Sequence, residues 1–406
     1  MVDWETKPLG ELCEFRRGLT YGKSDEVDVS SNVVLRANNV DLATYTLDLS
    51  DLRYISDSVS VPATKKVRRG SLLICTASGS KSHLGKIAYV DDDYGYAFGG
   101  FMGQITPAPG VNDRYLFHAL TSPAYKGFIE ALSDGVNINN LKFDDLRQFP
   151  VPIPDLDEQQ RIVAILDEAF EGIATAKANA EKSLQNAREL YECQLESLFA
   201  SGDCNWPVRP LAQLATIING YAFKSTDFQR TPGVRSIKIT NVGVRAFVDD
   251  ASNYLPTTFS PLHSGVAVTQ GSIVLALTRS IIAGGLKVAM VPIDFDGALL
   301  NQRVAAIQPH TAQLETAFLF AYLSTRRVMN FVKSRVNTLM QPNLSIGDLR
   351  LLPVPLPALS EQHALVEAVQ RFKEDSQKLE STYVRKLAAI DDLKKSLLHQ
   401  AFTGAL

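Results

Sequence analysis

The sequence is poor in cysteine and tryptophan and has no long apolar run. Of its 406 residues, four are cysteines (Cys13, Cys75, Cys193 and Cys204), and none forms a close pair with another cysteine or with a histidine. Structural zinc needs closely spaced ligands, so we expect no metal site and interpret the cysteines as buried free thiols in a reducing compartment. No segment approaches the roughly 20 apolar residues that cross a bilayer.

Neither sign of charge is in excess. The 41 basic and 44 acidic residues give a net charge of −3 and a pI of about 6.1. This balance argues against a uniformly basic nucleic-acid binder, but it is compatible with one basic patch facing phosphate. Residues 1–10 have no basic stretch followed by an apolar one, so we expect no secretory signal and a cytoplasmic location.

Catalytic motifs are equally scarce. The sequence contains no GxSxG, no HExxH and no Asn/Asp-Pro-Pro-aromatic tetrapeptide. Residues 79–86 (GSKSHLGK) approach a phosphate-binding loop, but five residues separate the two glycines instead of four. We interpret them as a turn before a strand. These absences favour a binding chain over an enzyme.

What the sequence does contain is an internal repeat. Asn39-Val40 returns as Asn241-Val242, and VPIP at 151–154 returns as VPLP at 354–357. The offset stays between 201 and 203 residues over the whole repeat. An offset this constant indicates a duplicated unit, and two similar units in one chain can contact two separated sites on one long partner.

Each repeat begins with a mixed part and ends with a helical part. Short β-branched runs bounded by turn formers predict strands, and each mixed part closes with a helical piece, 113–132 or 314–332. The predicted strands are 33–35, 71–75, 86–90, 234–239, 272–277 and 286–291. We predict an α+β fold with mixed domains at 1–154 and 204–357, each followed by a long helix, at 155–203 and 358–406.

The two long helices follow from apolar periodicity. Over 158–200 and 360–402, apolar residues recur mostly every three or four positions, and neither segment contains proline. Each helix would be about 60 Å long, too long to bury its apolar stripe on one domain. The simplest solution is an antiparallel coiled-coil pair with one domain at each end. The alternative is that each helix packs on its own domain.

A proline-rich joint precedes each helix. Alternating prolines at 150–154 and 353–357 favour an extended, stiff backbone. We predict Asp157 and Ser360 as the N-caps that follow, because short oxygen-bearing side chains stabilise a helix start. Such joints would fix the angle between domain and helix.

These features resemble the specificity subunit of type I restriction–modification systems. The resemblance rests on the repeat, on the joint leading into Glu158-Gln159 and Glu361-Gln362, and on the domain openings Pro8-Leu9 and Pro210-Leu211. Residues 287–289 leading to Asn301-Gln302-Arg303 are also similar to that family. The first repeat departs there, because Gly99-Gly100-Phe101 replaces Asn-Gln-Arg, so its turn must be supported otherwise.

The resemblance implies a catalytically silent chain. Each mixed domain would be a target-recognition domain for one half of a split, asymmetric DNA site, and the helices would be a spacer. Two modification subunits carrying S-adenosylmethionine would methylate adenine N6. Restriction subunits using ATP and magnesium would translocate and cleave. A spacer of about 60 Å would span on the order of 18 base pairs.

Candidate DNA contacts are polar or basic residues, since these side-chain types read base edges or hold phosphate. Those at 76–83 lie just past a predicted strand end, where a loop could enter a groove. In the first domain they are Arg36, Asn38, Asn39, Lys65, Lys66, Arg68, Arg69, Thr76, Ser78, Ser80, Lys81 and His83, of which the basic run 65–69 suits phosphate. In the second domain they are Lys238, Thr240, Asn241, Thr278, Arg279 and Ser280.

Two other functions stay open at this point. The chain could be a coiled-coil scaffold with two protein-binding modules and no role on DNA, although the basic run 65–69 argues mildly against it. It could also be a self-contained methyltransferase, against which the missing cofactor motif argues.

Overall fold

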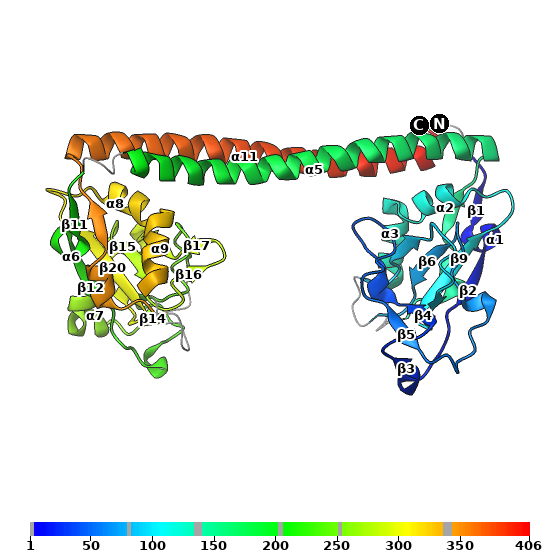
Figure 1. Ribbon diagram of the computed structural model, residues 1–406, viewed down its shortest axis with the longest axis horizontal. Coiled ribbons are helices and arrows are strands. Elements are labelled where there is room, and N and C mark those ends of the chain that lie inside the picture. The colour runs from blue at the N-terminus through cyan, green and yellow to red at the C-terminus, as the bar shows by residue number, and fades with distance from the viewer. Residues whose placement is uncertain (1–3, 79–82, 134–139, 202–205, 251–253, 336–342) are drawn as a thin grey trace. The chain divides into compact units, whose positions relative to one another are not determined.

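The computed structural model describes residues 4–78, 83–133, 140–201, 206–250, 254–335 and 343–406 (Figure 1). They divide into two compact units. Unit 1 comprises residues 1–181 with 385–406, and unit 2 comprises residues 182–384. Each unit therefore contains one mixed domain and a stretch of each long helix. The predicted domains were consecutive stretches of sequence, whereas unit 1 combines residues from both ends of the chain.

The described strands of unit 1 form three sheets. A four-stranded antiparallel sheet has the order β2 (Cys13–Arg17), β9 (Met102–Pro107), β6 (Leu72–Cys75), β7 (Ile87–Tyr89). A second sheet has the order β3 (Glu26–Val27), β5 (Arg53–Ile55), β4 (Asn32–Leu35), β8 (Ala97–Phe98), in which the β4–β8 pair is parallel. β1 (Thr6–Pro8) pairs with β10 (Pro150–Pro152), which closes the domain beside the joint.

Unit 2 repeats this topology. Its main sheet has the order β12 (Ala215–Asn219), β20 (Val304–Pro309), β15 (Ile273–Ala276), β18 (Val288–Met290). The second has β14 (Tyr254–Leu255), β13 (Val234–Ile237) and β19 (Leu299–Leu300), with β13 and β19 parallel. β11 (Val208–Pro210) pairs with β21 (Pro353–Pro355), and β16 (Ile281–Ile282) forms a hairpin with β17 (Gly285–Leu286). The α+β fold, the repeat and the six predicted strands are confirmed.

The two predicted helical pieces are each broken into two helices. Unit 1 has α1 (Leu9–Leu12), α2 (Asp113–Ala119), α3 (Pro123–Ser133) and α4 (Phe143–Leu146). Unit 2 has α6 (Leu211–Leu214), α7 (Phe259–Leu262), α8 (Thr316–Leu323), α9 (Arg326–Arg335) and α10 (Ile346–Arg350). The break comes at a hydroxyl: Ser122 Oγ donates to Ala119 O and Thr325 Oγ1 to Tyr322 O, both at 2.7 Å. A hydroxyl that bonds back to the preceding turn competes with helix continuation.

The two long helices are α5 (Leu156–Ser201) and α11 (Leu359–Phe402), which confirms the helices predicted from apolar periodicity. They run antiparallel in each unit. In unit 1, Lys177 Nζ lies 3.1 Å from Asp391 Oδ1, and in unit 2, Ser376 Oγ donates to Ala187 O at 2.8 Å. In unit 1, Leu166 of α5 belongs to the same buried core as residues of α2 and α11. The helices thus pack both on each other and on their domains.

The first turn of α5 is tied to the domain through Gln159. Its side chain is 1% exposed, and Oε1 accepts from the backbone N–H of Asn112 at 2.8 Å. Its Nε2 donates to Pro154 O at 2.9 Å and to Gly110 O at 3.3 Å. One buried carboxamide therefore connects the start of α5, the proline joint and the N-cap of α2.

Gln362 makes the same connection in unit 2. Its Oε1 accepts from the Glu315 N–H at 2.8 Å, and its Nε2 donates to Gln313 O and Pro357 O, both at 2.9 Å. Because buried amides are satisfied only in one geometry, this repeated pattern holds each helix start at a set angle to its own domain. It gives a structural role to the Glu-Gln pairs of the sequence.

The predicted N-caps of the long helices are wrong. Asp155, not Asp157, caps α5, because its Oδ1 accepts from the Glu158 N–H at 2.9 Å. At the start of α11 the Ala358 carbonyl accepts from the Glu361 N–H at 2.9 Å, so the helix begins one residue before Ser360. In both cases a single residue separates the last proline of the joint from the first residue of the helix.

The cysteine interpretation is confirmed in part. Cys13 and Cys75 are buried free thiols, and burial raises the pKa of Cys13 to about 12, which makes it inert. Cys193 is exposed on α5, contrary to expectation, and Cys204 lies outside the described residues.

Candidate nucleic-acid interface

Three strand ends of unit 1 meet at one edge. The Gly99 N–H donates to Leu35 O at 2.9 Å, which brings the end of β8 against the end of β4. The Thr76 N–H and Oγ1 both lie 2.9 Å from Phe101 O, which brings the end of β6 to the same turn. Arg36 and Thr76, predicted from different parts of the sequence, therefore lie around Phe101.

Unit 2 builds the same edge. The Asn301 N–H donates to Ile237 O at 2.9 Å, and the Leu277 N–H donates to Arg303 O at 2.8 Å. Lys238 is the residue after Ile237, and Thr278 and Arg279 come directly after Leu277. These three residues therefore lie around the turn 301–303. We call residues 36, 76, 78 and 101 in unit 1, and 238, 278, 279 and 303 in unit 2, the strand-end cluster of each unit.

The turn that centres each cluster is held by backbone contacts. A Cβ on Gly18 would lie 2.0 Å from Gly99 O, and one on Gly220 would lie 2.1 Å from Asn301 O. Only glycine permits these close approaches. The Met102 N–H donates to Gly99 O at 2.8 Å, and the Val304 N–H donates to Asn301 O at 2.9 Å. The first repeat, which has Gly99-Gly100-Phe101 in place of Asn301-Gln302-Arg303, thus forms the same turn without Asn and Gln side chains.

Two lysines in or beside the cluster of unit 2, Lys238 and Lys287, are partly desolvated. Burial lowers the pKa of the Lys238 ammonium, an effect that the Asp250 carboxylate opposes. Burial also lowers the pKa of Lys287, and the neighbouring charge of Arg279 lowers it further. The Lys287 ammonium donates to Ile239 O. Partly desolvated cations gain when a phosphate or an electron-rich base edge approaches.

Arg279 is the most exposed basic member of the predicted set in unit 2. Its φ is 49°, a left-handed conformation that side chains other than glycine rarely adopt. A tight turn holds it there, since the buried Ser280 Oγ donates to Leu277 O at 3.0 Å.

Two cluster members were not predicted from the sequence. Phe101 is 73% exposed, and Arg303, at the equivalent place in unit 2, is exposed as well. The comparison of Gly99-Gly100-Phe101 with Asn301-Gln302-Arg303 already marked this turn, but it gave no reason to prefer the third residue. The two clusters therefore present different chemistry, an aromatic ring in one and a guanidinium in the other.

Several predicted contacts are buried and bonded within the chain. Asn39 is 1% exposed, accepting from the Arg36 N–H at 2.8 Å and donating to Asp48 O and Asp51 O. Asn241 accepts from the Lys238 N–H at 2.9 Å and donates to Val248 O. Their amides hold the loops after β4 and β13 in shape. Thr76, Thr278 and Ser280 are buried too.

The basic run of unit 1 is split by the fold. Lys65 Nζ donates to Arg17 O at 2.8 Å and so braces the domain, and Lys66 is half-buried beside it. Arg68 and Arg69 are exposed but precede β6, whereas Thr76 follows it. About 13 Å of strand separates them from the strand-end cluster. They cannot act as one compact contact with it.

The remaining candidates lie on the surface or outside the described residues. Asn38 and Thr240 are exposed, and Ser78 and His83 are half-buried. Ser80 and Lys81 fall among residues that the structure does not describe. Within its described parts, the chain has no group of three or more His, Cys, Asp or Glu side chains placed to hold a metal ion. None of the described helices is long and apolar enough to span a membrane.

The repeat matches a known family twice. The family model for the type I restriction modification DNA specificity domain matches residues 1–185 and again residues 204–387. The EcoKI specificity subunit of Escherichia coli (strain K12) is 24% identical over 420 residues, 99% of this chain and 89% of that relative. The MjaVIII specificity subunit of Methanocaldococcus jannaschii is 26% identical over 315 residues, 73% of this chain and 71% of that relative.

Solved structures share the fold. A chain from a study of complex assembly and conformational transition of the type I R-M system has a TM-score of 0.77 at 17% identity, with 99% of this chain and 98% of that chain covered. The HsdS subunit from Thermoanaerobacter tengcongensis has a TM-score of 0.60 at 17% identity, with 99% and 97% covered.

Proposed function

The chain belongs to the type I restriction–modification DNA specificity family, and from this premise we propose that it reads a bipartite, asymmetric DNA site with one half per unit. The observation that carries the proposal is the strand-end cluster, built by the same backbone contacts in both units but with different side chains at its centre. One scaffold with two sets of side chains suits one duplex with two different half-sites.

The proposed contacts are the exposed or half-buried members of the two clusters and their neighbours. In unit 2, Arg279 and Arg303 supply guanidinium groups, which pair with O6 and N7 of guanine in the major groove or with phosphate. In unit 1, Phe101 supplies an apolar face of the kind that contacts a thymine methyl group. The buried Asn39 and Asn241 shape these loops and are left out of the contact set. The other proposed contacts are the cluster members Arg36, Ser78 and Lys238 and the neighbours Asn38, His83 and Thr240.

Arg68 and Arg69 belong to a separate proposed contact with the DNA backbone. They are exposed at the opposite end of β6 from Thr76, and the Arg69 N–H donates to Asp93 Oδ1 at 2.9 Å. Arginines without a groove-facing loop beside them suit phosphate rather than bases. The acidic residues nearby limit this contribution.

We further propose that the chain performs no catalysis and directs partner subunits to the site. Two modification subunits carrying S-adenosylmethionine would methylate adenine N6, and restriction subunits using ATP and magnesium would translocate and cleave DNA. Partner subunits that grip phosphate would explain how a chain with a net charge of −3 functions on DNA. A DNA-directed complex of this kind would act in the cytoplasm.

The spacer role rests on α5 and α11. Both continue without a break from residues of one unit to residues of the other, and the buried amides of Gln159 and Gln362 fix their starts. A proline-stiffened joint locked by a buried amide transmits orientation, which a flexible linker would not do. We propose that this pair sets the number of unread base pairs between the half-sites.

Selection from a randomised duplex library tests the proposal. The complex of this chain with its modification subunit is incubated with the library, and retained DNA is sequenced. We expect enrichment of one sequence with two specified blocks and a fixed unspecified gap. A complex that retains DNA without any enriched sequence would instead support a scaffold with no DNA readout.

A further inference from the structure

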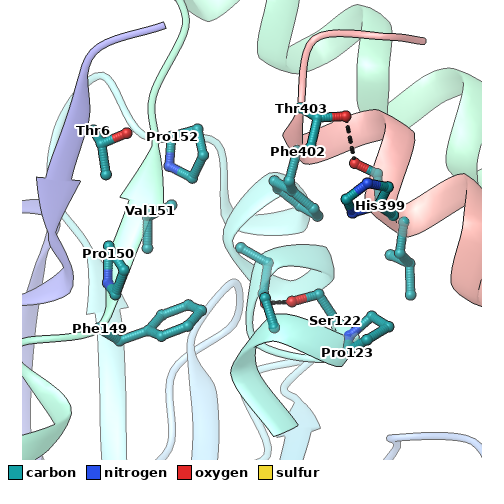
Figure 2. Close-up of a pocket in the computed structure, with 13 residues that line it drawn as sticks. Thr6, Ser122, Pro123, Phe149, Pro150, Val151, Pro152, His399, Phe402 and Thr403 are labelled. Atoms are coloured by element: carbon teal, nitrogen blue, oxygen red, sulfur yellow. Dashed lines mark hydrogen bonds between the residues drawn. The ribbon is translucent and has the colours of Figure 1, made fainter. Parts of the chain in front are cut away.

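A pocket of about 340 Å³ opens in unit 1 beside the joint (Figure 2). Phe149 and residues 150–152 of the joint line one side, and His399 and Phe402 of α11 line the other. Leu398 of α11 and Ala119 of α2 also line the pocket. Its lining is largely apolar, and His399 is the one titratable side chain among the 13 lining residues. A cavity of roughly 150 Å³ already receives a benzene ring, so this pocket has room for an aromatic group.

The repeat identifies what fills the equivalent place in unit 2. The N-caps Asn112 and Glu315 donate their N–H groups to Gln159 and Gln362, in the first turns of α5 and α11. Ser122 Oγ bonds Ala119 O just as Thr325 Oγ1 bonds Tyr322 O. In both contacts the residue of unit 2 lies 203 positions after its counterpart in unit 1. Tyr322 lies 203 positions after Ala119, so the two residues occupy equivalent positions.

Tyr322 completes an aromatic cluster that unit 1 lacks. In unit 2 the ring of Phe199 lies 5.4 Å from those of both Phe318 and Tyr322. In unit 1 Phe402 and Tyr115 form the equivalent pair, 5.2 Å apart, but Ala119 stands where the third ring would be. The pocket therefore includes the space of one missing aromatic side chain.

The aromatic side chain that Tyr322 supplies in unit 2, and that unit 1 lacks at Ala119, carries a hydroxyl. Tyr322 is 2% exposed, and its OH donates to Pro353 O at 2.7 Å. Pro353 pairs with Pro210 as Pro150 pairs with Pro8, so the Pro150 carbonyl is the equivalent acceptor, and Pro150 lines the pocket. The hydroxyls of Ser122 and Thr403 donate to carbonyls of the helices that precede them, Ala119 O of α2 and His399 O of α11. Apolar walls and one carbonyl at the far side suit a phenol.

We infer that this pocket receives a tyrosine side chain of a partner protein chain, the modification subunit, so the inference rests on the proposed function for the identity of that partner. Thr6, Pro123, Ala124 and Pro150 are exposed around it, so a side chain can enter from outside. None of the candidate DNA contacts lines it, and its near absence of charge does not suit a nucleic acid. A buried aromatic anchor in a preformed pocket is typical of a protein interface.

The pocket itself is tested with 4-methylphenol, the side chain of tyrosine, and with toluene as the probe without a hydroxyl. Binding to the full chain is followed by ligand-observed NMR. We expect 4-methylphenol to bind more tightly than toluene, and Ala119→Tyr to weaken it at least tenfold. The same substitution at exposed Ala43 should leave binding unchanged. Equal binding by wild type and Ala119→Tyr, or no binding by wild type, would overturn the assignment.

Unit 2 provides the reverse experiment, which does not depend on the folding of Ala119→Tyr. Tyr322→Ala should create a second phenol site, so the chain should bind two equivalents of 4-methylphenol instead of one and regain thermal stability with the probe present. Tyr322→Phe should keep the ring but lose the bond to Pro353. Failure of the probe to rescue Tyr322→Ala would contradict the equivalence of the two positions.

The partner is tested by assembling the modification subunit on wild type, Ala43→Tyr and Ala119→Tyr chains. We expect the filled pocket to weaken assembly at least tenfold, while Ala43→Tyr assembles as wild type does. Equal assembly of all three would overturn this inference and leave the proposed function standing. If the wild-type chain does not assemble, the proposed partnership itself is wrong, and the docking inference is wrong with it.

Discussion

The side-chain oxygen of Gln159 accepts a hydrogen bond of 2.8 Å from the backbone N–H of Asn112, 47 residues earlier in the chain. Gln362 and Glu315 repeat the contact at the same length and the same sequence separation. Because both glutamines also bond the carbonyl of the last proline in the joint, each long helix starts at a defined place on its domain.

Gln159→Ala should destabilise unit 1. It would leave a buried N–H and two carbonyls without their partner, at about 1–3 kcal/mol for each group that water cannot reach, so we expect a loss of about 3 kcal/mol. Trp4 and Trp206 lie one in each unit, so in a Trp206→Phe background the fluorescence of Trp4 during urea unfolding reports on unit 1. The exposed neighbour provides the control, since Gln160→Ala should change little.

This contact shows what the sequence does and does not predict. The apolar stripes at 158–200 and 360–402 end within two residues of the observed helices, because helical periodicity is a local property, although the predicted bound of 406 for the second helix lies four residues past its end. The partners of Gln159 lie 47 residues away, and nothing local marks them. The N-cap prediction failed since Asp155 and Asp157 offer the same carboxylate, and only the path of the chain after Pro154 decides between them.

The candidate site shows the same limit. Arg36 and Thr76 lie near one edge of unit 1, which the sequence did not predict, and Asn39 and Asn241 turn inward to bond their own loops. Phe101 was missed because an exposed aromatic residue after two glycines has no local signature of function. Whether a side chain points inward is set by tertiary packing rather than by residue type.

Unit 1 should lose stability as the pH falls below about 7. His118 is buried with its Nε2 2.9 Å from Asp167 Oδ1, and burial lowers its pKa although Asp167 opposes this. The unfolded chain therefore takes up a proton near pH 6.5 that the folded chain does not, which costs at most about 1.4 kcal/mol per pH unit. His118→Leu should flatten this dependence between pH 7 and 5, measured by urea unfolding with Trp4 as the reporter.

A second transition should appear at lower pH. Partial burial opposes ionisation of Asp167, but hydrogen bonds from His118 and Arg114 outweigh it and lower the pKa to about 2. A lowered carboxyl pKa gives stability that is lost as pH falls from about 4 to 2. His118→Leu should retain part of this loss through Arg114. The exposed His399→Leu should keep the wild-type profile throughout, and a flat wild-type profile would contradict the assignment.

Arg279→Ala should weaken recognition of the half-site read by unit 2 alone. Removing a bidentate arginine contact costs about 1–3 kcal/mol, or roughly fivefold to over a hundredfold in affinity, and relaxes one base position. Competition with duplexes mutated in one half-site measures it. Arg209→Ala, an exposed arginine on β11 beside the joint, is the matched control. Equal losses of affinity at both half-sites would refute the proposal that each unit reads one half-site.

Phe101→Ala should have the opposite selectivity. The ring is 73% exposed, so we expect a change of less than about 0.5 kcal/mol in the free energy of unfolding. Affinity should fall only for duplexes with an intact unit 1 half-site. Val29→Ala, at another exposed apolar position of unit 1, serves as the control. Unchanged affinity would remove Phe101 from the proposed contact set.

Lengthening the helix pair should lengthen the unread gap. Four residues inserted near Ala180, with four more in the facing stretch of α11 near Ile390, add about 6 Å of helix, close to two base pairs. Library selection with the lengthened chain should return the same two specified blocks with a wider gap. An unchanged gap would show that α5 and α11 do not set the spacing.

The most direct measurement of the central claim is a genome-wide map of N6-methyladenine in a strain carrying this chain with its modification subunit, compared with a strain lacking only this chain. The account predicts that one split motif, with two specified blocks and a fixed gap, is methylated in the first strain and unmethylated in the second. Identical methylation in both strains would contradict the claim that this chain directs methylation to a DNA site.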